Sequence, residues 1–207
     1  MSIRVVLADD QEMVRTGFAM ILGSCADIEV VGQCGDGVAA LDLIDRLSPD
    51  VALLDIRMPR LDGIAVTRRV SGQTSVVIVT TFGDDEYVDQ ALAAGACGFL
   101  LKDSGPGLLV AGVRAAATGD ALISPELTIP LLRRTRGRTP VATLEGLSPR
   151  EIEVARLVAR GRTNSEIAEE LFLSLATVKT HLTNITTRLG LRNRVEVAAR
   201  VWESGQA

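Results

Sequence analysis

The sequence predicts an α/β domain with a doubly wound, five-stranded parallel sheet, followed by a small all-α domain. In residues 1–118, five short apolar runs alternate with segments in which apolar residues recur at helical spacing. In residues 147–207, only helical patterns occur, and they begin at strong capping signals. A β–α repeat of this kind forms a parallel sheet with helices on both faces. We therefore expect two domains, 1–118 and 147–207, joined by a linker at 119–146.

The expected strands lack the apolar–polar alternation of a half-exposed sheet, which indicates that both sheet faces are covered. They are Ile3–Ala8, Ile28–Gly32, Val51–Asp55, Val76–Thr80 and Gly98–Leu101. The expected helices are Glu12–Leu22, Val38–Leu47, Ile64–Val70, Asp85–Ala94 and Leu108–Ala117. Asp84 is expected to cap the fourth of them. Gly32, Gly35 and Gly37 do not have the spacing of a dinucleotide-binding loop, and we interpret them as turn residues.

Composition and charge exclude several classes of protein. Apolar residues make up 47% and charged residues 23%, which is typical of a globular protein rather than a disordered one. Apolar stretches are only a few residues long, so no transmembrane helix is expected, and the first strand leaves no room for a signal peptide. Three cysteines without metal-binding spacing favour a reducing cytoplasm. The net charge is −7 in residues 1–118 and +3 in residues 119–207, so the second half suits a polyanion, or is simply a solvated surface.

Polar side chains gather where the expected strands end. They are Asp9 and Asp10 after the first strand, Asp55 at the third, Thr80 at the fourth and Lys102 after the fifth. The carboxyl ends of parallel strands meet at one sheet edge, so these groups are expected in one pocket. Clustered carboxylates are best neutralised by a hard cation such as Mg²⁺. Asp55, at the centre, is placed to attack a phosphoryl group, with the metal, the lysine and the threonine hydroxyl around the phosphoryl oxygens.

The first 118 residues resemble the receiver domains of NarL/FixJ-type two-component response regulators, which have a flavodoxin-like fold. The resemblance lies in Asp9-Asp10, the run LLDIRMPRLDG over residues 53–63, Thr80, and AGACGFLLK over residues 94–102. It implies that Asp55 is the phosphoacceptor and that Asp9, Asp10, Asp55 and the backbone carbonyl of Arg57 bind the metal. It also implies that Thr80 and Phe99 are the switch residues and Lys102 the lysine of the site. Asp103 stands where many receivers have proline, and the segment 66–75 is short for the usual third helix and its loop.

Residues 119–146 predict a linker, because Pro, Thr, Gly and Arg accumulate there and periodicity fades. A short helix over residues 125–134 is expected, broken or kinked at Pro130. Four arginines within the linker either hold DNA phosphates or form a solubilising surface. They are Arg133, Arg134, Arg136 and Arg138.

Four short helices are expected after the linker. Ser148 and Glu151 form a capping box around Pro149 at the first helical position, and Thr163 and Glu166 form a second capping box. Ser174 is expected to cap a third helix that ends at Gly190, and a fourth begins near Asn193. The turn at Phe172-Leu173 joins the middle two, which predicts a helix-turn-helix.

The outward face of the third helix is polar, uncharged and short. At about 100° per residue, Thr180, Thr183 and Thr187 fall opposite Val178 and Leu182. No Asp or Glu occurs between Ser174 and Gly190, and such a face suits the major groove of DNA. Only two of the 22 basic residues are lysines, one at the expected phosphoryl pocket and one, Lys179, beside this face. A compact ammonium fits a crowded phosphate pocket better than a guanidinium does.

The helical half is similar to the LuxR-type helix-turn-helix. The similarity lies in LSPREIEV at 147–154, NSEIA at 164–168, TVKTH at 177–181 and LGLRNR at 189–194. It implies a recognition helix that begins near Ser174, with Lys179, Thr180 and Thr183 facing DNA. His181, the only histidine, is implied to lie near the DNA backbone or to pack inside the domain. Thr183 is often basic in relatives, which implies a lower non-specific affinity here.

Together these features predict a bacterial response regulator in the cytoplasm. A sensor histidine kinase is expected to phosphorylate Asp55, after which the protein binds paired half-sites in double-stranded promoter DNA as a homodimer. The stripe of Val195, Ala199 and Trp202 is expected to contribute to the dimer, or else to pack within its own domain. One alternative is a constitutive DNA-binding protein with a phosphorylation-independent receiver. Another is a phosphatase, but the chain has no insertion that could cap a substrate, so no enzyme activity is expected.

Overall fold

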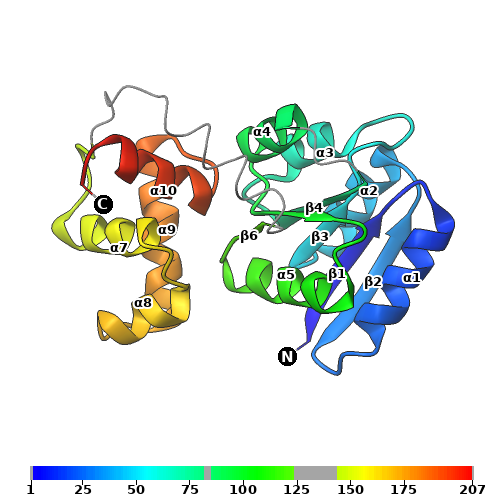
Figure 1. Cartoon of the computed structure of the whole chain (residues 1–207), viewed down its shortest axis with the longest axis horizontal. Coiled ribbons are helices and arrows are strands. Elements are labelled where there is room, and N and C mark those ends of the chain that lie inside the picture. The colour runs from blue at the N-terminus through cyan, green and yellow to red at the C-terminus, as the bar shows by residue number, and fades with distance from the viewer. Residues whose placement is uncertain (1, 82–84, 124–143, 207) are drawn as a thin grey trace. The chain divides into compact units, whose positions relative to one another are not determined.

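The computed structural model describes residues 2–81, 85–123 and 144–206, which form two compact units, Met1–Thr128 and Ile129–Ala207 (Figure 1). The expected cap at Asp84, the expected helix over residues 125–134 and the four linker arginines lie outside the described residues. Among the described helices, none is long and apolar enough to cross a membrane.

The first unit contains a parallel sheet in the strand order β2-β1-β3-β4-β5-β6. The strands are β1 (Ile3–Ala8), β2 (Ile28–Cys34), β3 (Val51–Leu54), β4 (Ser75–Thr80), β5 (Gly98–Leu101) and β6 (Leu122–Ile123). All residues of β3 are buried, and so are all but the first of β4, which agrees with the uninterrupted apolar runs. The predicted fold class is therefore confirmed, with one short strand added at the edge.

Two groups of helices cover the two faces of this sheet (Figure 1). One face carries α1 (Glu12–Gly23) and α5 (Pro106–Thr118), and the other carries α2 (Gly37–Leu47), α3 (Gly63–Val70) and α4 (Asp85–Ala94). The short segment before β4 still forms a helix of two turns, because the Asp62 side chain caps it. Gly37 allows the start of α2 to approach the loop between β3 and α3, since a Cβ at this position would lie 2.1 Å from the carbonyl oxygen of Leu61.

The second unit consists of α7 (Pro149–Ala159), α8 (Asn164–Glu170), α9 (Leu175–Leu189) and α10 (Arg194–Glu203). Both predicted capping boxes are present, and the Ser174 side chain accepts a hydrogen bond from the backbone N–H of Thr177 at the start of α9. Gly190 ends α9 in the left-handed conformation that glycine adopts without strain. These signals set the helix boundaries that position the outward face of α9.

The core of the helical unit uses a different face of α10 from the stripe singled out in the sequence. Val197 and Val201 are fully buried, whereas Val195 and Ala199 are half-buried. Trp202 is 65% exposed, although its indole N–H donates to the carbonyl oxygen of Ala159 at 3.0 Å. The stripe therefore remains partly at the surface, and its tryptophan is hydrogen-bonded to its own unit.

Candidate functional sites

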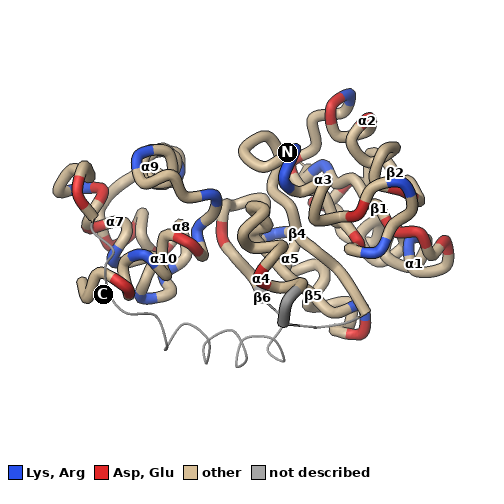
Figure 2. The backbone as a smooth tube through the Cα atoms, turned by 90° about the horizontal axis from the view of Figure 1, so that it is seen from above, with Lys and Arg blue, Asp and Glu red and all other residues tan. Residues whose placement is uncertain are grey.

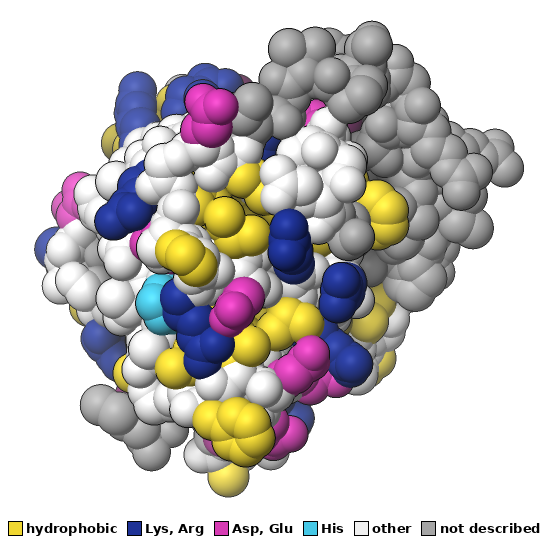
Figure 3. All heavy atoms as spheres, turned by 90° about the vertical axis from the view of Figure 1, so that its left-hand side faces the viewer, with side chains coloured by type: hydrophobic (Ala, Val, Ile, Leu, Met, Phe, Trp, Pro, Cys, Tyr) yellow, Lys and Arg dark blue, Asp and Glu magenta, His cyan; other side chains and the backbone are white. Residues whose placement is uncertain are grey.

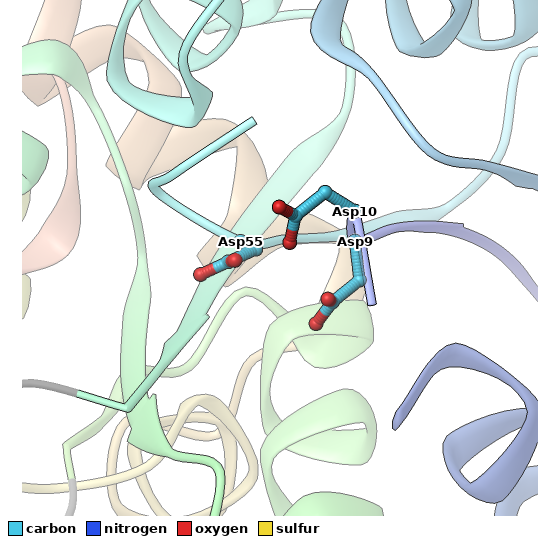
Figure 4. Close-up of side chains that lie close together, drawn as sticks. All are labelled: Asp9, Asp10 and Asp55. Atoms are coloured by element: carbon cyan, nitrogen blue, oxygen red, sulfur yellow. The ribbon is translucent and has the colours of Figure 1, made fainter. Parts of the chain in front are cut away.

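Three carboxylates meet at the carboxyl edge of the sheet (Figure 4). Asp9 and Asp10 follow β1, and Asp55 follows the neighbouring β3. One oxygen from each lies within 4.8 Å of the others. Asp9 and Asp55 are 4% and 5% exposed, whereas Asp10 is exposed to solvent. The structure thus brings together the three carboxylates that the strand order predicted to converge.

Lys102 adds a single positive charge to this cluster. The lysine follows β5, and its Nζ lies 2.7 Å from Oδ2 of Asp9 and 3.0 Å from Oδ2 of Asp55. Its side chain is only 7% exposed, so these ion pairs are shielded from solvent. Three carboxylates and one ammonium leave a net charge of −2, which a divalent cation would balance.

Burial and the neighbouring charges change the acidity of this pocket. Burial raises the pKa of Asp55 above its ordinary value, and the charge of Asp9 adds to the rise, while the hydrogen bond and charge of Lys102 oppose it. Burial alone would lower the pKa of Lys102. The hydrogen bonds and charges of Asp9 and Asp55 together outweigh this effect, so the pKa of Lys102 is raised. The pocket is therefore short of positive charge even with the lysine in place.

The backbone around Asp55 is held closely. Its N–H donates to the carbonyl oxygen of Ala8 at 2.8 Å, and its Oδ1 accepts from the N–H of Ile56 at 2.8 Å. Gly63 packs against the same peptide, since a Cβ there would lie 2.0 Å from the carbonyl oxygen of Asp55. The side chain of Arg57 is directed elsewhere, with its guanidinium 5.9 Å from the ring centroid of Tyr87 on α4.

Thr80 and Phe99 lie in the strands beside the carboxylates. Thr80 ends β4 and is 3% exposed, and its carbonyl oxygen accepts from the N–H of Lys102 at 2.8 Å. Phe99 is fully buried in β5, in register with Ile78 of β4. Both predicted switch residues are therefore on strands that lead directly to the pocket.

The oxygen ligands of the pocket fit a small hard cation. Mg²⁺ prefers carboxylate and carbonyl oxygens and keeps several waters. Two buried carboxylates and one exposed carboxylate supply such oxygens, and the exposed Asp10 leaves one side of the cluster open to water. The donor set is therefore compatible with Mg²⁺ and unlike the nitrogen and sulfur sets that bind zinc.

A second candidate site is the outward face of α9. Lys179, Thr180, Thr183 and Thr187 are exposed, opposite the buried Val178, Leu182 and Ile185 that anchor the helix. The α9 tube carries basic positions and no acidic ones (Figure 2). The predicted face therefore is at the surface.

His181 lies between this face and the core. It is half-buried, and its Nδ1 is buried without a hydrogen-bond partner among the described residues. The face shown in Figure 3 carries Lys and Arg side chains together with acidic and apolar ones. Both implied roles, contact with the DNA backbone and packing, are compatible with this position.

Sequence reasoning identified Glu151 only as a capping residue, but it also holds α9 in place. Glu151 is 2% exposed, and its Oε2 accepts from the N–H of Ser148 at 2.7 Å and from Nη1 of Arg188 at 3.1 Å. Burial would raise the pKa of Glu151, but the hydrogen bonds from Ser148 and the charge of Arg188 lower it overall. A glutamate in a capping box gives no signal in the sequence that a distant arginine will pair with it.

Comparisons with known proteins place the chain in a family. The response regulator receiver domain matches residues 5–114, and the luxR family of bacterial regulatory proteins matches residues 145–201. The chain belongs to the response regulators with a receiver domain and a LuxR-type DNA-binding domain.

Full-length relatives agree with this assignment. The chain is 40% identical over 200 residues to the transcriptional regulatory protein LiaR of Bacillus subtilis, covering 95% of both chains. The crystal structure of the response regulator ChrA, from a heme-sensing two-component system, is 37% identical with a TM-score of 0.55, covering 100% of this chain and 99% of that one. A complex of the response regulator RcsB with DNA is 25% identical with a TM-score of 0.58, covering 98% and 99%.

Proposed function

We propose that Asp55 is the phosphoacceptor of this response regulator and that its phosphorylation controls DNA binding by α9. The observation that carries the proposal is the buried cluster of Asp9, Asp55 and Lys102 beside Asp10. A carboxylate oxygen of Asp55 attacks phosphorus of a phosphohistidine in a sensor kinase, the N–P bond breaks, and an acyl phosphate forms. Asp9, Asp10, Asp55 and the carbonyl of Arg57 would hold Mg²⁺, which supplies positive charge for the phosphoryl oxygens.

The chain's own residues take up the new charge. Lys102 already lies 3.0 Å from Asp55, so its ammonium needs little movement to pair with a phosphoryl oxygen. The hydroxyl of Thr80, at the end of the adjacent strand β4, would donate a hydrogen bond to a phosphoryl oxygen. We propose that a shift of Thr80 toward the phosphoryl group is coupled to Phe99, which is already fully buried in β5, and changes the surface of the receiver.

We propose that α9 enters the major groove of double-stranded DNA. Its exposed face free of acidic residues supports this role, as does the DNA complex of RcsB. Lys179, Thr180 and Thr183 would face the bases, while Thr187 and His181 would lie nearer the backbone. The partly exposed stripe on α10, formed by Val195, Ala199 and Trp202, would contribute to a homodimer on paired half-sites.

The remaining assignments follow from this function. We propose a receiver over residues 1–118, a linker over 119–146 and a DNA-binding domain over 147–207. The first family match, 5–114, falls within the receiver, and the second, 145–201, begins two residues before the proposed DNA-binding domain. The protein would act in the cytoplasm, where bacterial DNA and the phosphodonor domains of sensor kinases are found. We propose that it regulates transcription and does not turn over a substrate of its own.

Intact-mass spectrometry tests the phosphoacceptor directly. With acetyl phosphate and MgCl₂, wild type should gain one phosphoryl group and Asp55→Ala none. Asp42→Ala is a matched control, because Asp42 is exposed and pairs with Arg46 one helical turn away. This control should be labelled like wild type. Equal labelling of Asp55→Ala would refute the assignment.

A further inference from the structure

We propose that α9 recognises DNA in part through thymine methyl groups, contacted by the methyl groups of Thr180 and Thr183. The inference rests on the proposed entry of α9 into the major groove. It specifies which chemical group of the bases α9 contacts.

The hydroxyl hydrogens of Thr180 and Thr183 are used within the helix. Thr180 Oγ1 donates to the carbonyl oxygen of Ala176 at 3.0 Å, and Thr183 Oγ1 donates to the carbonyl oxygen of Lys179 at 3.1 Å. A hydroxyl has one hydrogen to donate, so neither threonine has a donor left for a base. Each bond also holds its side chain in one rotamer. What remains for DNA is a fixed methyl group and an oxygen that can only accept.

The surroundings of these methyl groups favour an apolar contact. No acidic side chain occurs on α9 to accept from the amino groups of cytosine or adenine. Besides Lys179, the helix carries Arg188. Its Nη1 donates to Oε2 of Glu151 at 3.1 Å and to the carbonyl oxygen of Gly146 at 3.0 Å. The thymine methyl is the apolar group that the base pairs present in the major groove. Short side chains with fixed methyl groups can approach it closely.

The competing possibility is that the threonine oxygen accepts a hydrogen bond from a base amino group. Two substitutions of one residue separate the possibilities. Thr183→Val keeps the branched shape and the methyl group and loses the oxygen, whereas Thr183→Ser keeps the oxygen and loses the methyl. The same pair can be made at Thr180, and thermal unfolding followed by circular dichroism shows whether each variant is folded.

The experiment uses the full chain treated with acetyl phosphate and MgCl₂. Sites are first enriched from random double-stranded DNA, and each thymine of the enriched site is then replaced by deoxyuridine, which lacks only the methyl. We expect one or more replacements per half-site to weaken wild-type binding by about fourfold, the value of one buried methyl. Thr183→Ser should bind the unmodified site about fourfold more weakly and be insensitive to one of these replacements. Thr183→Val, which keeps the methyl group, should remain sensitive to this replacement and bind the unmodified site more tightly than Thr183→Ser does.

The outcomes distinguish the inference from the function on which it rests. If wild type enriches no double-stranded sequence, the proposed DNA-binding function fails and the inference with it. If a sequence is enriched but no deoxyuridine replacement weakens binding, the function stands and the inference is overturned. If Thr183→Val weakens binding as much as Thr183→Ser does, the oxygen is the contacting group and the inference is also overturned.

Discussion

Asp55→Asn should stabilise the first unit when no divalent cation is present. Asp55 is attracted by Lys102 at 3.0 Å and repelled by Asp9 and Asp10, whose oxygens lie within 4.8 Å. At an effective dielectric constant of about 20, the attraction is worth about 5.5 kcal/mol and each repulsion about 3.5 kcal/mol. The two repulsions exceed the attraction, and burial of the charge adds to the cost. We expect the neutral side chain to raise the free energy of unfolding by roughly 1–2 kcal/mol.

Urea unfolding in EDTA measures this difference. The single tyrosine, Tyr87, is on α4 of the first unit, and the single tryptophan, Trp202, is on α10 of the second, so their fluorescence follows the two units separately. With a urea dependence of about 2 kcal/mol per M, the Tyr87 transition should move to higher urea by roughly 0.5–1 M, and the Trp202 transition should not move. Excess MgCl₂ should stabilise wild type more than the variant, because the variant has lost one ligand.

The effect should depend on pH in a defined direction. Since the pKa of Asp55 is raised in the folded protein, wild type loses stability as the pH rises from the ordinary value of 3.8 through the raised pKa. The advantage of Asp55→Asn should therefore be absent below pH 3.8 and constant above the raised pKa. Asp42→Asn, at an exposed aspartate, should shift neither transition by more than about 0.5 kcal/mol. A variant less stable than wild type in EDTA at neutral pH would refute the reasoning.

Three further predictions concern the helical unit. Glu151→Gln should lower its stability by about 1–3 kcal/mol, because Arg188 and the Ser148 N–H lose a charged partner; an unchanged Trp202 transition in urea would contradict the role of this pair. Trp202→Ala, if folded by circular dichroism, should bind paired half-sites more weakly than wild type but single half-sites equally, and equal binding to both would exclude a dimer contact there. Lys179→Ala should relax base preference at one position per half-site by about 1–3 kcal/mol; a uniform loss of affinity with a smaller salt dependence would instead indicate a phosphate contact.

The elements that position both sites were predictable from the sequence. Strands buried on both faces, such as Val51–Leu54, leave a continuous apolar run, and polar residues at the strand ends must meet at one edge. The capping residues of α7, α8 and α9 signal their positions through side-chain chemistry within four residues. Both kinds of signal are local, so a single sequence contains them.

Features that depend on distant contacts were not predictable. Strand β6 has only two residues and lies in the segment predicted as linker. It was not predictable, because so short a strand forms only by pairing with β5, which is distant in the sequence. Leu144 of the same segment is buried in the helical core. On α10, Val195 and Val197 are equally apolar, and only the packing of α7 and α9 decides which of them is buried. The internal hydrogen bonds of Thr180 and Thr183 depend on side-chain rotamers, which residue spacing does not specify.

The most direct test of the account measures DNA affinity with and without phosphorylation of Asp55. Fluorescence anisotropy titrations would use one enriched double-stranded site, with wild type and Asp55→Ala each incubated with MgCl₂ in the presence and absence of acetyl phosphate. We expect acetyl phosphate to lower the concentration of wild type needed for half-saturation and to leave that of Asp55→Ala unchanged. Equal affinity of wild type under the two conditions, or an equal response of the variant, would contradict control of DNA binding through Asp55.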